Sequence, residues 1–195
     1  MVRANTIMKS DTKRAAIASS LADIVLVDGL GELALRRAAR HLGMSDRMLL
    51  YYFGAKSQIV IAVLACISLR QSSMLRADPT APPASPDRVL NKAWSIVSDP
   101  VFVPFMRVWI EVVSRGTRGE TPYTTLGKRA ISNWLSWIET RLDLPRGIAR
   151  RQQAAAILTV LQGATFLEMS NPKSTRGVPK LLSAALDLER LRTQN

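Results

Sequence analysis

Cysteine, histidine and long apolar runs are all scarce in this sequence. Cys66 is the only cysteine among 195 residues, so no intrachain disulfide can form, and we expect its side chain to pack in or beside a helix in a reducing compartment. His41 is the only histidine and has no metal-ligand partner at a suitable spacing, which predicts a surface position. The longest unbroken apolar run, 59–67, is much shorter than the roughly 20 residues of a membrane span. No apolar segment follows the first basic residues, so we expect a cytoplasmic protein.

Motifs for catalysis and cofactor binding are missing as well. The sequence has no nucleophile elbow, no glycine-rich phosphate loop, and no grouping of histidine, aspartate and glutamate at metal-ligand spacing. We therefore expect no enzyme activity, no metal and no cofactor.

The charge balance is strongly basic, with 27 lysines and arginines against 15 acidic residues and a net charge of +12. Such a balance favours a polyanionic partner, nucleic acid first and an anionic membrane surface second. The excess is spread over the chain, so charge alone does not locate an interface. The apolar fraction of 47% predicts a globular chain with a core of its own.

Proline and glycine divide the chain into segments. Residues 77–86 hold four prolines, which end any helix and predict a semi-rigid connection, and 115–122 and 170–179 are also typical of loops. Between these breaks, apolar residues recur three or four positions apart, which is the helical period, and strand-like alternation is absent. The sequence predicts an all-α fold of about nine helices, three of them before residue 57 and the others at 57–76, 87–98, 101–114, 123–144, 147–169 and 178–192.

The most informative segment is 33–56, which predicts two short helices joined by a tight turn. The apolar face of the first helix consists of Leu35, Ala38, Ala39 and Leu42. Gly43 follows where the chain must adopt a left-handed conformation to leave that helix. Ser45 is placed to cap a new helix by accepting a hydrogen bond from the amide of Arg47 or Met48.

The second helix of this pair, at about 45–52, is predicted to offer Leu49 and Phe53 to the core. The small side chain of Ala39 would let the two helices cross closely. This is the geometry of a helix-turn-helix, which presents its second helix to the major groove of DNA.

The segment resembles the DNA-binding domain of the TetR family of bacterial one-component regulators. The resemblance covers residues 13–66, and the matching residues are Asp28, Gly29, Arg36, Ala39, Gly43, Ser45, Leu49, Tyr51, Phe53, Gly54 and Lys56. The sequence departs from the family pattern at Ala34 and Ala55, where helix-capping residues are usual. It also departs at Asp46, where lysine is more usual; an aspartate there favours the helix dipole but repels phosphate.

The resemblance implies a helix-turn-helix DNA-binding domain over 1–56 and a helical ligand-sensing and dimerisation domain over 57–195. A homodimer would bring two DNA-binding domains to the half-sites of a near-palindromic operator in double-stranded DNA. A small molecule bound in the second domain would favour the state that releases DNA, as in a ligand-responsive repressor.

Seven residues are candidates for DNA contacts. Arg47, in the first turn of the second helix, can bond bidentately to guanine. Lys56, just before the next helix, can hold a phosphate at that helix's N-terminus. Tyr51 can either reach a phosphate or pack in the core. The full set is Arg36, Ser45, Arg47, Met48, Tyr51, Tyr52 and Lys56.

Aromatic residues gather in the predicted helices between 87 and 144, where they predict either an apolar ligand pocket or an ordinary core. In the first case, Trp109 and Trp134 would be the main walls of a cavity between the helices at 87–98, 101–114 and 123–144. Basic residues outnumber acidic ones there, which predicts a neutral or weakly anionic hydrophobic effector rather than a cation. The candidate lining residues are Trp94, Phe102, Phe105, Met106, Trp109, Trp134 and Trp137.

The last two predicted helices, 147–169 and 178–192, have small and leucine-rich faces. By resemblance, they would pair with their copies in a four-helix dimer interface, and packing within one chain is the alternative. The candidate interface residues are Ile157, Leu161, Gly163, Ala164, Leu182 and Leu186.

Two other functions also fit the sequence. The chain could be a DNA-binding regulator that senses no small molecule, and its second domain would then have a solid core. It could instead be a basic helical protein that binds a membrane or an acidic partner, and it would then bind anionic vesicles but not DNA.

Overall fold

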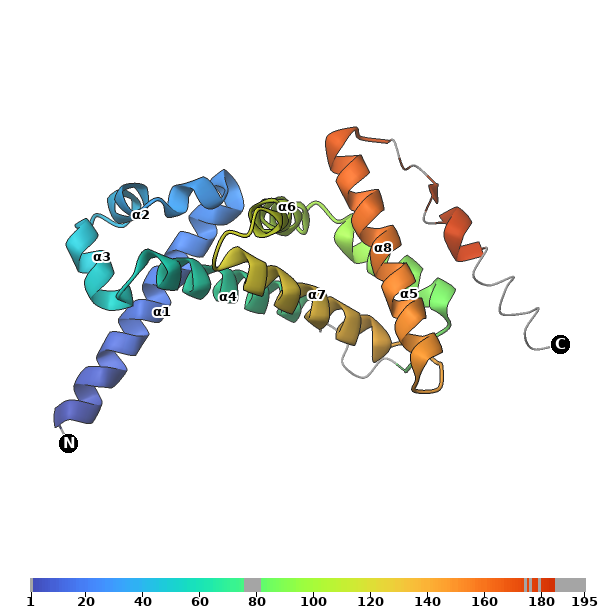
Figure 1. Ribbon diagram of the computed structural model, residues 1–195, viewed down its shortest axis with the longest axis horizontal. Helices are drawn as coiled ribbons and strands as arrows, with labels where there is room; N and C mark the ends of the chain where they lie inside the picture. The colour runs from blue at the N-terminus through green and yellow to red at the C-terminus, as the bar shows by residue number, and fades with distance from the viewer. Residues whose placement is uncertain (1, 76–81, 174, 176, 179, 185–195) are drawn as a thin grey trace. The chain divides into compact units, whose positions relative to one another are not determined.

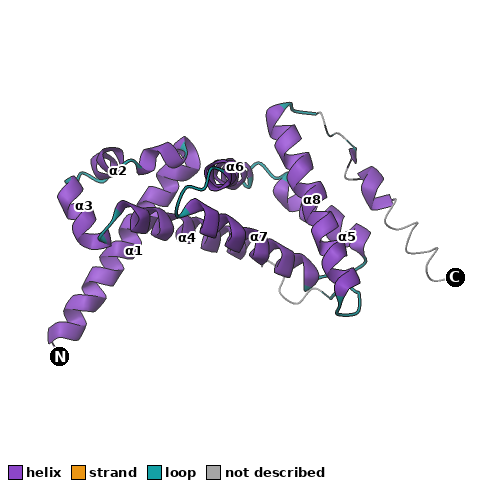
Figure 2. Cartoon of the chain, viewed as in Figure 1, coloured by secondary structure: helices purple, strands orange, loops and turns teal. Residues whose placement is uncertain are grey.

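The structure, a computed structural model, describes residues 2–75, 82–173, 175, 177–178 and 180–184, with only the backbone described for 2–10 (Figure 1). Within these residues the chain is helical, and the one strand-like contact is an isolated bridge between Ala84 and Leu142 (Figure 2). The predicted all-α fold class is therefore confirmed. The elements are α1 (Val2–Asp28), the 3-10 helix η1 (Leu30–Leu33), α2 (Leu35–His41), α3 (Asp46–Phe53), α4 (Lys56–Leu75), α5 (Pro86–Val97), α6 (Val103–Thr117), α7 (Tyr123–Glu139) and α8 (Ile148–Ser170).

The last helix expected from the sequence, 178–192, lies only partly within the described residues. Residues 180–184 are helical, and 185–192 lie outside the described part of the chain.

The described residues form two compact units. The N-terminal unit comprises residues up to Met74 together with Arg107–Gly127, and the C-terminal unit comprises Leu75–Met106 together with residues from Lys128 onward. The first unit thus contains more than the 1–56 segment expected to bind DNA, because most of α4 and α6 cluster with the three N-terminal helices. Buried residues of α4 and α6 enlarge the apolar core of a domain that would otherwise be very small.

In the N-terminal unit, α1 contributes a buried face that repeats every four residues. Ile17, Leu21 and Val25 are all at most 4% exposed, as the helical period requires of a face that packs on a core. This helix packs against η1 and α3. Arg70 of α4 donates hydrogen bonds to the carboxylate of Asp23 and to the backbone of Ser19, which ties α4 to α1.

Among the described helices, α4 is the one long and apolar enough to cross a membrane by length and composition, with a mean hydropathy of 1.5 in its most apolar stretch. The buried core helix of a globular protein meets the same criteria. Ile59, Val63 and Ile67 of α4 are at most 5% exposed, so these three residues pack in the core of the N-terminal unit, whereas Leu69 is 66% exposed.

In the C-terminal unit, α5 and α8 pack side by side (Figure 1). Both helices carry buried apolar residues, namely Val89, Leu90, Ala93 and Val97 of α5 and Ala154, Ile157, Leu158, Leu161 and Ala164 of α8. Phe102 and Trp134 add an edge-to-face ring contact with centroids 6.1 Å apart. These helices position the walls of a pocket, described below.

Candidate nucleic-acid interface and ligand pocket

The turn between α2 and α3 has the geometry that the sequence predicted. Gly43 has a φ of 61°, in the left-handed region that side chains with a Cβ rarely adopt. The amide of Met44 donates to the carbonyl of Ala39 at 2.9 Å, which closes the end of α2. Because a Cβ at Gly43 would meet no atom within 4 Å, the backbone conformation, and not lack of space, requires glycine here.

The start of α3 is capped as expected. The hydroxyl oxygen of Ser45 accepts a hydrogen bond from the amide of Met48 at 3.2 Å. Asp46 lies in the first turn, where a negative charge favours the helix dipole. Leu49 is fully buried and Phe53 is 4% exposed, so the prediction that both face the core is confirmed.

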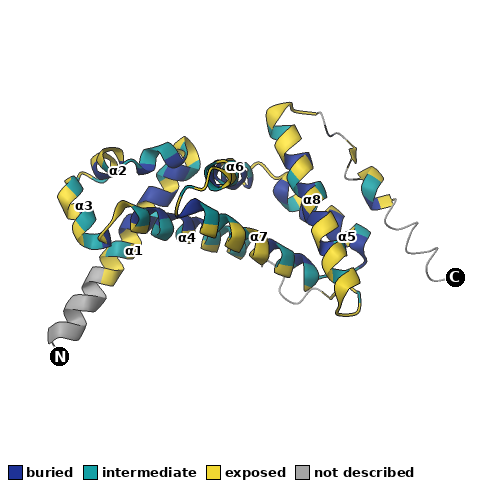
Figure 3. Cartoon of the chain, in the orientation of Figure 1, coloured by how far each residue is buried: buried dark blue, intermediate teal, exposed yellow. Residues whose placement is uncertain are grey.

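The opposite face of α3 is open to solvent (Figure 3). Arg47 is exposed, Met48 is 50% exposed and Tyr51 is 81% exposed, which excludes core packing for Tyr51. Tyr52 is half-buried and meets the Tyr51 ring edge-on, with centroids 5.4 Å apart. A guanidinium, a thioether and a phenol therefore project together from one short helix.

Two further basic candidates flank α3. Arg36 is exposed on α2, and Lys56 is exposed at the first residue of α4. An alanine precedes both α2 and α4, and its methyl side chain cannot accept a hydrogen bond from the first backbone amides of the helix. Backbone amides in the first turn of α4 lie beside Lys56, a combination that suits a phosphate group.

The Glu32 carboxylate links η1 to α2 through contacts that were not predicted from the sequence. One carboxylate oxygen of Glu32 accepts from Arg37 at 2.8 Å, and the other lies 2.8 Å from Nε2 of His41. The hydrogen bond with His41, followed by that with Arg37, lowers the pKa of the Glu32 carboxyl below its usual value. Arg37 and His41 lie five and nine residues after Glu32, which are not the spacings of contacts within a helix, so no simple sequence pattern predicts these hydrogen bonds.

A second missed contact holds the junction between α1 and η1. Both carboxylate oxygens of Glu111, on α6, accept from the amide of Leu30, at 3.1 and 3.3 Å. Gly29 has a φ of 89°, and a Cβ there would come within 2.7 Å of the Glu111 carboxylate. The carboxylate thus satisfies an amide at the start of η1, and glycine allows its close approach.

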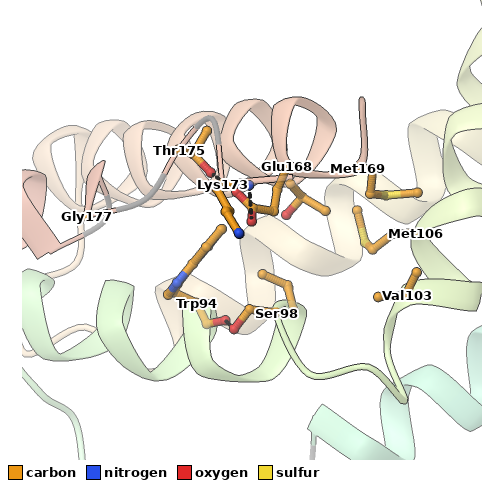
Figure 4. Close-up of a pocket in the computed structure, with 11 residues that line it drawn as sticks. Trp94, Ser98, Val103, Met106, Glu168, Met169, Lys173, Thr175 and Gly177 are labelled. Carbon is orange, nitrogen blue, oxygen red and sulfur yellow. Dashed lines mark hydrogen bonds between the residues drawn. The ribbon is translucent and has the colours of Figure 1, made fainter. Parts of the chain in front are cut away.

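The C-terminal unit contains a pocket with a volume of about 360 Å³ (Figure 4). This volume falls within the range of small-molecule sites, roughly 300–1,000 Å³. Its walls come from α5 and the residue after it, from the first turn of α6, and from α8 and the turn that follows. The lining residues are Trp94, Val97, Ser98, Val103, Met106, Thr165, Glu168, Met169, Lys173, Thr175 and Gly177.

Polar groups in the pocket differ in whether they have partners. One carboxylate oxygen of Glu168 accepts from the amide of Lys173 at 2.9 Å, and the other accepts from the hydroxyl of Thr175 at 2.6 Å. The hydrogen bond from Thr175 is the main reason that the pKa of Glu168 is lowered. The hydroxyl of Thr165, by contrast, is buried and has no hydrogen-bond partner within the described residues.

Two of the seven residues predicted to line a ligand site are found in the wall of this pocket. Trp94 and Met106 line the cavity, but Phe102, Phe105 and Trp134 are at most 8% exposed and pack in the core. Their rings interlock edge-on or tilted at centroid distances of 5.7 to 6.1 Å, so the expected gap between bulky side chains is filled.

The other two tryptophans are also absent from the pocket wall. The Nε1 of Trp137 donates to the carbonyl of Leu75, and the guanidinium of Arg141 lies over its ring at 4.1 Å. Trp109 belongs to the N-terminal unit. Residues 123–144, which were expected to bound a cavity, do not line this pocket, where α8 and the turn after it supply that wall.

The predicted dimer residues need a similar correction. Ile157, Leu161 and Ala164 are at most 5% exposed because they pack within the C-terminal unit, so they offer no surface to a partner. Gly163 is exposed, Leu182 is half-buried, and Leu186 lies outside the described residues. The solvent-exposed face of α8, which we call the outer face, consists of Ala155, Ala156, Thr159, Gly163, Phe166 and Leu167.

Known structures share this fold. A protein from Rhodococcus sp. described as a TetR-family transcriptional regulator superposes with a TM-score of 0.68 at 20% identity, covering 90% of this chain and 96% of that one. A transcriptional regulator from Saccharomonospora viridis, in complex with choline, has a TM-score of 0.67 at 16% identity, covering 91% and 94%. No protein-family model and no curated protein sequence matches the chain. The fold is thus the one found in TetR-type regulators, as the sequence predicted.

Proposed function

We propose that this protein is a DNA-binding transcriptional regulator that inserts α3 into the major groove. The observation that carries the proposal is the geometry of α2 and α3: a glycine turn, a serine cap, and a second helix with a buried apolar side and a solvent-exposed face. That arrangement is what a helix-turn-helix needs to reach base edges. The net charge of +12 supplies the general attraction to phosphate.

Within this interface, each exposed side chain has an expected role. Arg47 reads a guanine through its two parallel N–H groups. Arg36, Tyr51 and Lys56 contact phosphates and fix the register of α3 on the duplex. Met48 makes an apolar contact in the groove. Ser45 and Tyr52 support these contacts, Ser45 by capping α3 and Tyr52 by packing against the Tyr51 ring.

The regulator is proposed to act in the cytoplasm as a homodimer that pairs through the outer face of α8. Phe166 and Leu167 are 53% and 51% exposed, which is unusual for large apolar side chains on a well-packed helix. Small residues at Ala155, Ala156 and Gly163 would let a second copy of α8 approach closely. A two-fold dimer then presents two copies of α3 to the half-sites of a near-palindromic operator.

The pocket is proposed to make DNA binding depend on a small molecule. A ligand that binds the non-DNA-binding conformation more tightly would shift the population toward it and release DNA, which is the behaviour of a repressor. The choline bound in the Saccharomonospora viridis regulator supports a ligand-binding role for proteins of this fold. The lining around Trp94 and Thr165 provides such a site in this chain.

A gel-shift assay with genomic DNA fragments tests the DNA-binding part of the proposal, with anionic phospholipid vesicles as the competing partner. We expect nanomolar-range binding to a small set of fragments, weaker by orders of magnitude on unrelated DNA. Binding to vesicles without selective DNA binding would instead favour a membrane-surface protein. Sedimentation of wild type and Phe166→Asp tests the dimer, which we expect only for wild type.

A further inference from the structure

The Glu168 carboxylate in the pocket has hydrogen-bond partners, whereas the Thr165 hydroxyl has none among the described residues. Both oxygens of Glu168 already accept hydrogen bonds, from the Lys173 amide and the Thr175 hydroxyl. Thr165 lines the pocket and is only 6% exposed. Its hydroxyl has no hydrogen-bond partner among the described residues. A buried polar group without a partner is costly, so a site that keeps one usually has something to fill it.

The Lys173 ammonium is a second hydrogen-bond donor that lines the pocket. Lys173 lines the pocket, and its side chain extends from the turn after α8 toward the α5 wall in Figure 4. Among the described residues its ammonium makes no ion pair. The ammonium can donate but cannot accept hydrogen bonds.

The remaining walls are apolar. Trp94, Val97, Val103, Met106 and Met169 supply an indole, two branched aliphatic side chains and two thioethers. Such walls favour a compact hydrocarbon or aromatic body. Flexible methionines on two different helices can adapt to its outline.

We propose that the pocket takes a compact apolar carboxylate, whose acidic head accepts hydrogen bonds from the Thr165 hydroxyl and the Lys173 ammonium while its body packs against Trp94 and the two methionines. The inference rests on the proposed function in taking this pocket as the effector site. A carboxylate gives an acceptor to the Thr165 hydroxyl, which has no partner among the described residues, and an opposite charge to the Lys173 ammonium. A cation would meet the Lys173 ammonium and a carboxylate already engaged by two donors.

The test uses calorimetric titration of the full chain, free of DNA, with three probes of equal chain length: octanoate, 1-octanol and octylammonium. We expect octanoate to bind most tightly, 1-octanol more weakly and octylammonium weakest. Preference for octylammonium, equal affinity for all three, or no binding of any probe would overturn the proposal.

Variants of the two donors assign the contacts. Thr165→Val should weaken octanoate binding by roughly 3- to 10-fold, the value of one hydrogen bond, while Thr165→Ser should retain it. Thr117→Val is the matched control, because the Thr117 hydroxyl is exposed at the end of α6, lies outside the pocket and donates to the Ser114 carbonyl. If Thr165→Val binds octanoate as tightly as wild type, the proposed contact is wrong.

A second pair of variants measures how much the charge of the Lys173 ammonium contributes to octanoate binding. Lys173→Gln should remove the preference for octanoate over 1-octanol and leave 1-octanol binding nearly unchanged, whereas Lys92→Gln, an exposed lysine of α5 outside the pocket, should change neither. A preference that survives Lys173→Gln would contradict the proposed role. Octanoate binding without any DNA binding would leave this inference standing and overturn the proposed function; selective DNA binding without octanoate binding would do the reverse.

Discussion

The helix-turn-helix and the pocket of the C-terminal unit differ in whether their polar groups have hydrogen-bond partners. At α3, the Ser45 oxygen satisfies the Met48 amide, and the Gly54 amide donates back to the Leu50 carbonyl, so both helix ends are closed. At the pocket, α8 buries the Thr165 hydroxyl with no partner among the described residues. The polar groups at the ends of α3 are paired within the helix, whereas the Thr165 hydroxyl lacks a hydrogen bond among the described residues.

This difference suits two kinds of partner. A helix with satisfied ends keeps its shape and can present Arg47 and Tyr51 to a large polyanion as a fixed surface. A buried unpartnered hydroxyl costs on the order of 1–3 kcal/mol, and only a molecule small enough to enter the pocket can remove that cost. Closed helix ends at α3 and an unmade hydrogen bond at α8 fit the proposed regulator, which would read DNA with one region and bind a small molecule with the other.

The largest expected effect separates the two sides of α3. Leu49→Ala should lower the free energy of unfolding by about 2–5 kcal/mol, because Leu49 is fully buried and its removal leaves a cavity. Met48→Ala, one residue earlier but 50% exposed, should change it by only about 0.5 kcal/mol. Chemical denaturation measures both, and similar losses would show that α3 does not lie as described.

The next effect concerns the exposed face of α3. Arg47→Ala should weaken operator binding by about 1–3 kcal/mol and relax base preference at one position in each half-site, because a bidentate guanine contact is lost. Quantitative gel shifts on a set of operator variants measure both. A uniform loss on all sequences would reassign Arg47 to a phosphate.

Lys56→Ala provides the matched comparison. A lysine that contacts phosphate should be needed equally on every sequence, and its loss should flatten the dependence of affinity on salt by about one unit of slope per subunit. An altered base preference in this variant would contradict the assignment.

At the pocket, the comparison predicts a gain of stability. Thr165→Val should raise the free energy of unfolding of the ligand-free protein by about 1 kcal/mol, because the variant buries a methyl group where wild type buries an unpartnered hydroxyl. Thr117→Val should give no such gain, since its hydroxyl is exposed and donates to the Ser114 carbonyl. Destabilisation by Thr165→Val would mean that the hydroxyl has a partner in solution.

The smallest expected effect tests the rule that closed helix ends stabilise the N-terminal unit. Ala34 precedes α2 with extended dihedral angles and offers no side-chain acceptor. Ala34→Ser should add a cap and raise the free energy of unfolding by about 0.5–1 kcal/mol in denaturant titrations. Ala55→Ser before α4 gives an independent second case, and no gain in either would show that local capping does not limit stability here.

The helix-turn-helix was predictable because its determinants are local. Gly43 fixes its own backbone, and Ser45 bonds an amide three residues away, so neither depends on distant parts of the chain. The buried positions Leu49 and Phe53 followed from a four-residue period. The helical fold class was predictable for the same reason.

The pocket was not predictable, because its walls are chosen by contacts between distant residues. Trp94 and Thr165 lie 71 positions apart in the numbering, and a threonine inside a helix carries no local mark of an unpartnered hydroxyl. Trp134 is of the type expected in a pocket wall, but its ring packs against Phe102 in the core. The contact between Glu111 and Leu30 spans 81 residues and was missed for the same reason.

The residues predicted for a dimer interface show a third reason why the sequence could not predict every site. A run of small and apolar residues on α8 predicts close packing but does not say which side packs within the chain. Ile157 and Leu161 face the core, while Gly163 and Phe166 face solvent. Only the position of α5 against α8 distinguishes the two sides.

Hydroxyl-radical footprinting on a DNA fragment selected from the genome tests the central claim most directly. The account predicts two protected half-sites related by two-fold symmetry, with centres one helical turn or a multiple of it apart, about 10–10.5 base pairs per turn. Arg47→Ala should require a protein concentration roughly 5- to 150-fold higher for the same protection, the equivalent of a loss of about 1–3 kcal/mol. Weak, unordered protection along every fragment, unchanged in Arg47→Ala, would contradict the claim that α3 reads a DNA sequence.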